Sequence, residues 1–167
     1  MVHADYSNIT GLTKDETLQH IIDSYTALET SNYVSNLSNL SSLLWYAYHS
    51  LNVKVNWSGF YLLNTKNENE LVLGPFQGKV ACQVIKIGSG VCGTAAETKK
   101  TQLVPDVEKY PTHIACDSET KSEIVVPIIK DGKCVGVIDL DCLELNGFDE
   151  VDQKYLEKLA ELITKTL

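Results

Sequence analysis

The chain has 167 residues, 44% of them hydrophobic, and a formal net charge of -8 at pH 7. This composition predicts one globular domain over residues 1–167, and so acidic a surface disfavours nucleic acid and anionic membranes as partners. No apolar run approaches the roughly 20 residues of a membrane span, and the first residues lack the basic and apolar segments of a secretory signal. We therefore expect an intracellular protein, cytoplasmic, with a nuclear location as the alternative.

Hydrophobic periodicity predicts helices at both ends and strands between them. Helices are expected over 14–29, 37–51, 94–99 and 149–164, the last with Asp149 as its N-cap. Strands are expected over 53–63, 71–73, 80–87, 101–104, 123–129 and 135–142. The order indicates an α+β fold with a central, largely antiparallel sheet flanked by N- and C-terminal helices.

A glycine-rich loop before the short helix has two interpretations. Gly88, Gly90 and Gly93 spell G-x-G-x-x-G, which is typical of dinucleotide sites, and Cys92 lies inside the motif. The predicted helix is too short for a parallel crossover and the neighbouring strands form hairpins, which disfavours a nucleotide. The alternative is a thiolate at Cys92 stabilised by the positive end of the helix dipole. A buried structural cysteine stays open as well.

The other cysteines separate by their surroundings. The chain has five cysteines and no C-x-x-C pair, which disfavours both a disulfide framework and structural zinc. Cys116 lies in a polar stretch and is expected to be accessible, as a reactive thiol must be. Cys82 is expected at the start of a strand, Cys142 is expected in the core, and Cys134 is assigned no role.

Acidic residues occur at strand spacing near the C-terminus. Asp139 and Asp141 are two residues apart and so point to one face of their strand, and Glu123 opens the predicted partner strand. Acids that lie close together raise one another's pKa, so this group would bind an ammonium and supply a proton. The simpler alternative is a solvent-exposed face.

Aromatic residues alternate on an earlier strand. Trp57, Gly59 and Tyr61 share one face, and the glycine is expected to leave a slot between the two rings. Ordinary core packing is the alternative, but a slot with aromatic walls suits a small apolar or sulfonium-like group. Rings, acids and thiols together predict a pocket for a small ligand with a cationic end, and redox chemistry.

Seven segments occur in the order WSGFYLL, LGPFQGKVACQVI, GVCGTAA, VPDV, HIACD, SEIVVPI and GVIDLDC. Over about residues 37–162, this set resembles the free methionine-R-sulfoxide reductases, stand-alone enzymes with the GAF fold. The resemblance implies redox roles for Cys82, Cys92 and Cys116. It also implies substrate binding by Trp57, Tyr61, Glu123, Asp139 and Asp141.

The resemblance also implies a mechanism without a bound cofactor or metal. A thiolate attacks the sulfoxide sulfur, Glu123 protonates the oxygen, and the resulting sulfenic acid condenses with a second thiol to a disulfide that thioredoxin reduces. We favour Cys116 as nucleophile, with Cys92 and Cys82 as the resolving thiols, because the polar loop of Cys116 precedes Glu123, whereas the helix start favours Cys92. A homodimer is expected. A non-catalytic GAF module that binds a small ligand and a thiol-based peroxide sensor are the alternatives.

Overall fold

The computed structural model describes residues 3–111 and 116–167. Its helices are η1 His3–Ser7, α1 Lys14–Leu28, α2 Tyr33–Ser50, α3 Gly90–Thr98, η2 Val107–Lys109 and α4 Glu150–Ile163. Its strands are β1 Val55–Leu63, β2 Glu70–Gly78, β3 Val84–Lys86, β4 Gln102–Val104, β5 Ser122–Lys130 and β6 Lys133–Cys142. They form one sheet in the order β3-β2-β1-β6-β5-β4, with antiparallel neighbours throughout. The predicted α+β class is confirmed.

The long helices begin at side chains that satisfy free backbone N–H groups. Thr13 and Glu16 form a capping box at α1, and Asn32 accepts a hydrogen bond from the first turn of α2. Asp149 and Asp152 form a second capping box at α4, which confirms Asp149 as the N-cap. No helix within the described residues is long and apolar enough to span a membrane.

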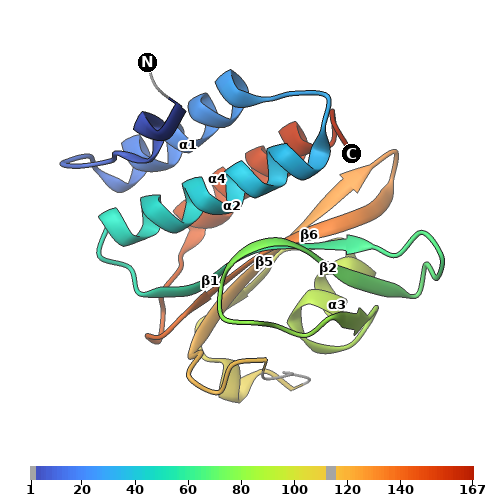
Figure 1. Ribbon diagram of the computed structural model, residues 1–167. Coiled ribbons are helices and arrows are strands. Elements are labelled where there is room, and N and C mark those ends of the chain that lie inside the picture. The colour runs from blue at the N-terminus through green and yellow to red at the C-terminus, as the bar shows by residue number, and fades with distance from the viewer. Residues whose placement is uncertain (1–2, 112–115) are drawn as a thin grey trace.

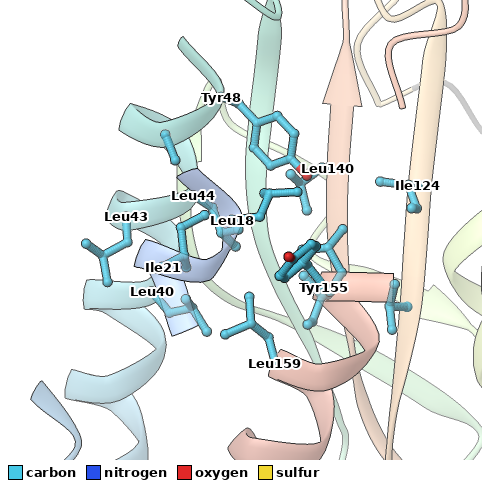
Figure 2. Close-up of a cluster of buried hydrophobic side chains, with 14 of the residues drawn as sticks. Leu18, Ile21, Leu40, Leu43, Leu44, Tyr48, Ile124, Leu140, Tyr155 and Leu159 are labelled. Carbon is cyan, nitrogen blue, oxygen red and sulfur yellow. The ribbon is translucent and has the colours of Figure 1, made fainter. Parts of the chain in front are cut away.

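The sheet separates two layers of different chemistry (Figure 1). The helices α1, α2 and α4 cover one face and enclose a large apolar core (Figure 2). The helix α3 covers the opposite face, together with Ala81 before β3 and with Val107 and Tyr110 at η2. Because side chains alternate along a strand, Ile124 and Leu140 point into the large core while their neighbours Val125 and Asp139 face the α3 side.

Two predicted elements differ from the structure near the glycine-rich loop. The strand expected over 80–87 is reduced to β3, so Cys82 precedes a strand instead of starting one. The helix expected from residue 94 begins one turn earlier, at Gly90. A Cβ at Gly93 would lie 2.3 Å from the carbonyl oxygen of Lys86, so only glycine lets α3 approach the end of β3 this closely.

Candidate active site

A cavity opens on the α3 side of the sheet. Its walls come from β1, β5 and β6, from the first turn of α3, and from the segments that precede β3 and β5. The predicted site residues that line it are Trp57, Tyr61, Cys92, Cys116, Glu123, Asp139 and Asp141. Cys82 joins the same region through a disulfide to Cys116. The structure therefore brings together residues from five separate stretches of the chain.

Strand register places the three acids side by side. Glu123 of β5 is paired directly with Asp141 of β6, and Asp139 lies two residues before Asp141 on the same face of β6. Glu123 and Asp139 are only 7% and 6% exposed, so the predicted cluster is a buried one and not a solvated face. Burial of this kind disfavours the charged form of a carboxyl group unless a cation accompanies it.

The pKa of every acid in the cluster is raised. Loss of hydration by burial is the main cause, and it raises the pKa of Asp139 from 3.8 to about 7. For Glu123, burial and then the charges of Asp139 and Asp141 hold the pKa well above its usual range. For Asp141, burial and then Asp139 act in the same direction. These directions favour retention of a proton by the cluster, and its protonation near neutral pH stays a prediction.

Cys92 contacts this cluster directly. It lies in the first turn of α3, is 4% exposed, and donates from Sγ to Oδ2 of Asp139 at 3.2 Å. Burial and the neighbouring carboxyls raise the pKa of the thiol well above its usual range. The expectation of a helix-stabilised thiolate at Cys92 is wrong, because desolvation and three acids outweigh the partial positive charge of the helix end.

Cys82 and Cys116 form a disulfide with a Cα–Cα distance of 5.8 Å. Cys116 is exposed, as its polar surroundings predict, and Cys82 is half-buried. The motif HIACD is described only from Cys116 onward, since residues 112–115 lie outside the described residues. The two sulfurs that close this bridge are separated by 34 positions in the sequence, so the pairing depends on how the two segments meet over the cavity.

The reason for preferring Cys116 over Cys92 as nucleophile needs correction. Cys92, not Cys116, is the thiol that hydrogen-bonds to an acid. Cys116 is exposed and lines the cavity, so its reduced thiol can reach a substrate, and its bond to Cys82 shows which thiol can resolve a sulfenic acid there. Among the three candidate thiols, only Cys82 and Cys116 have the geometry of a redox couple.

The aromatic residues form a wall instead of a slot. Trp57 stacks on Tyr61 with ring centroids 5.7 Å apart and on Phe76 of β2 at 5.2 Å. A Cβ at Gly59 would lie 2.4 Å from the Cβ of Phe76, so the glycine makes room for β2. The slot expected between Trp57 and Tyr61 is therefore absent, and the two side chains line the cavity as one side of it.

Several lining residues escape sequence reasoning. Lys79 pairs with Asp117 and Glu119, which links the segment before Cys82 to the segment after Cys116. Asn56 donates to Thr120 at 2.9 Å and holds that second segment against β1. Asn56 lies in β1, and the other residues are polar side chains in irregular segments, where neither periodicity nor motif spacing predicts a role.

The geometry also decides between the interpretations of the glycine-rich loop. The strands before and after α3, β3 and β4, lie at opposite edges of an antiparallel sheet. A dinucleotide site needs neighbouring parallel strands around its helix, so this interpretation is excluded. One group within the described residues, Cys92, Glu123 and Asp139, brings possible metal-binding atoms within 4.8 Å of one another. The predicted absence of a metal stays a prediction.

Comparison with known proteins gives consistent results. The model of the GAF domain family matches residues 38–167. The free methionine-R-sulfoxide reductase of Saccharomyces cerevisiae is 62% identical over 98% of this chain and 93% of its own length. A crystal structure of the free methionine-R-sulfoxide reductase of Neisseria meningitidis in complex with its substrate has a TM-score of 0.88 and 39% identity, covering 95% of this chain and 92% of that chain. A solved GAF-domain structure has a TM-score of 0.97 and 60% identity, covering 99% and 96% of the two chains. The chain belongs to the free methionine-R-sulfoxide reductases of the GAF-domain family.

Proposed function

We propose that this protein reduces free L-methionine-R-sulfoxide to L-methionine, with Cys116 as the nucleophile. The observation that carries the proposal is the position of the Cys82–Cys116 disulfide. Cys116 lines the same cavity as the three acids and an aromatic wall, so a redox-active thiol and a cation-binding cluster face one small space. The preference for the R form rests on membership of the family.

The cavity has complementary groups for both ends of the substrate. Among the residues that the structure describes, the Oδ1 atom of Asp139 is buried without a hydrogen-bond partner. A free ammonium would place a positive charge between Asp139 and Asp141, whereas the amide nitrogen of a peptide carries none. The wall formed by Trp57 and Tyr61 would receive the S-methyl group, which is apolar.

The chemistry requires one proton donor and one nucleophile. The Cys116 thiolate attacks the sulfoxide sulfur while Glu123, whose raised pKa keeps it protonated, donates a proton to the oxygen. The oxygen passes to the Cys116 sulfur as a sulfenic acid, and methionine leaves with its sulfur reduced by two electrons. Glu123 suits this role because it is buried in the cavity and close to Asp139.

The second cysteine completes the cycle. Cys82 attacks the sulfenic sulfur, a disulfide forms, and the oxygen leaves as water, so the two thiols together provide the two electrons. Thioredoxin is our proposed external reductant, since the exposed Cys116 is accessible to an attacking thiol. The predicted homodimer and the predicted cytoplasmic location stay predictions.

Single-turnover assays on cysteine variants test this proposal. Protein reduced with dithiothreitol and freed of the reductant is mixed with one equivalent of free methionine-R-sulfoxide, and released methionine is quantified. Wild type should release about one equivalent, and Cys82→Ser should do the same but stop as a sulfenic acid. Cys116→Ser should release less than about a thousandth as fast. Cys142→Ser, which alters a thiol in the large core, is the matched control and should behave like wild type.

The assay also separates the alternatives. A ligand-binding module would release no methionine from any variant. A peroxide sensor would lose thiols to hydrogen peroxide but leave the sulfoxide unchanged. Stoichiometric methionine from Cys116→Ser would keep the reductase activity but overturn the choice of nucleophile.

A further inference from the structure

The disulfide uses Cys82 and Cys116, which leaves Cys92 in the cavity without a redox partner. We propose that Cys92 is a positioning residue, whose thiol holds Asp139 so that the other carboxylate oxygen is presented to the ammonium of the substrate. This inference rests on the proposed function and removes Cys92 from the electron transfer that the family resemblance assigns to it.

The two oxygens of Asp139 have different surroundings. Oδ2 accepts a hydrogen bond from Sγ of Cys92 at 3.2 Å, and Oδ1 is buried with no hydrogen-bond partner in the described part of the chain. An unpaired buried oxygen is costly, so a site that retains one is suited to a ligand that donates to it. The thiol prevents the carboxyl group from turning both oxygens away from that ligand.

Both ends of this hydrogen bond belong to rigid elements. Asp139 lies in the centre of the sheet, where β6 is paired with Gly59 of β1 on one side and Val125 of β5 on the other. Cys92 lies on α3, which packs against β3 through the close contact between Gly93 and the carbonyl oxygen of Lys86. A donor placed on a packed helix fixes a side chain on a neighbouring strand more firmly than a donor on a loop would.

The environment of Cys92 favours a hydrogen-bond donor over a nucleophile. A donor must retain its proton, and burial beside Asp139, Glu123 and Asp141 raises the pKa of the thiol. A resolving cysteine needs the thiolate, which this environment disfavours. The same contacts that make Cys92 a suitable donor therefore make it a poor resolving thiol.

Steady-state kinetics of Cys92→Ala and Cys92→Ser test the role. Loss of the donor weakens ammonium binding in the ground state and the transition state alike, so Cys92→Ala should raise KM for free methionine-R-sulfoxide about tenfold. Its kcat should stay within about threefold of wild type. Cys92→Ser retains a donor and should restore KM to within about threefold. Cys134→Ala is the matched control, since Cys134 is a buried thiol that bonds to the carbonyl oxygen of Gly136, and its KM should not change.

Disulfide mapping after one turnover gives an independent readout. Peptide mass spectrometry of wild type treated with one equivalent of substrate should find Cys82 joined to Cys116 and a free thiol at Cys92. A disulfide that contains Cys92, an unchanged KM for Cys92→Ala, or loss of turnover in Cys92→Ser would each overturn the inference. If Cys92→Ala does not fold, full turnover of Cys92→Ser together with the mapped disulfide decides the question. Failure of wild type to release methionine would instead contradict the proposed function.

Discussion

The two faces of the sheet bury side chains of different chemistry, apolar on one face and acidic on the other. On the face under α1, α2 and α4, Ile124 and Leu140 are fully buried in an apolar core (Figure 2), and Ile138 is fully buried in the same core. On the other face of the same strands, Glu123 and Asp139 are buried as well, and their pKa values are raised. The side chains on the two faces are buried to a similar extent. Burial stabilises the apolar side chains, whereas it raises the pKa of the acids.

The difference shows how stability and binding are divided between adjacent residues. A buried leucine side chain contributes about 1.5–3 kcal/mol to folding, whereas a buried carboxyl group with a raised pKa costs free energy when it ionises. Each strand carries apolar side chains on one face and acids on the other. The folding free energy gained on the apolar face can therefore offset the cost of burying the acids. Substitutions on the cavity face should therefore change mainly the kinetics, and substitutions of their neighbours on the apolar face should change mainly the stability.

The largest effect is expected at Glu123 on the cavity face. Glu123→Gln removes the proton donor but keeps the shape, and kcat should fall about a thousandfold, as for loss of a general acid. Wild-type kcat should also fall as pH rises through the raised pKa of Glu123, since only the protonated form donates.

Glu108→Gln is the matched control for this variant, because Glu108 is an exposed acid on η2. Its kcat and its pH profile should match those of wild type. A Glu123→Gln variant that retained the wild-type kcat would remove Glu123 from the chemistry and leave only a contribution to substrate binding.

A smaller effect, of the opposite kind, is expected at Leu140, between Asp139 and Asp141. The side chain is fully buried in the large core, so Leu140→Ala should lower the free energy of unfolding by about 3 kcal/mol. The KM of the folded variant should stay within about threefold, because the removed atoms lie on the far side of the sheet from the cavity. Urea unfolding and steady-state kinetics on the same preparation check both parts. A large rise in KM with little loss of stability would contradict the separation of the two faces.

The fold is largely predictable from hydrophobic periodicity. The helices α1, α2 and α4 and the hairpin of β5 and β6 have strong patterns and clear caps or turns, and the structure places them close to the expected ranges. Prediction fails at β2, which continues to Gly78 beyond the expected residue 73, and at β3, which is shorter than expected. These strands lie at one edge of the sheet, where pairing with β1 and with each other decides their length more than local pattern does.

The site is predictable where regular elements present it. Spacing along one strand and pairing across a hairpin are enough to bring Glu123, Asp139 and Asp141 together. The Cys82–Cys116 bridge is not accessible to such reasoning, because both cysteines lie in irregular segments. The raised pKa of Cys92 is missed for another reason, since a helix start says nothing about which side chains approach from a distant strand.

The smallest effect expected here concerns Asp139 and its dependence on pH. Its pKa rises from 3.8 in the unfolded chain to about 7 in the folded protein, so the folded state binds the proton more tightly. The stability that this proton provides is fully present below about pH 4 and is lost as pH rises to about 7. Asp139→Asn still accepts from Cys92 but cannot ionise, so above pH 7 it should be more stable than wild type by at least about 1.4 kcal/mol, the equivalent of one pKa unit.

Urea unfolding between pH 4 and pH 8 measures this difference, and Asp117→Asn provides a control of opposite sign at the same cavity. The backbone N–H of Glu119 is the main cause that lowers the pKa of Asp117, so the carboxylate stabilises the folded state and Asp117→Asn should be less stable at neutral pH. That deficit should shrink as pH falls through the pKa of Asp117. If the stability curves of wild type and Asp139→Asn ran parallel over the whole range, the cavity face would be hydrated enough to bear its charges. The contrast between the two faces would then rest on geometry alone.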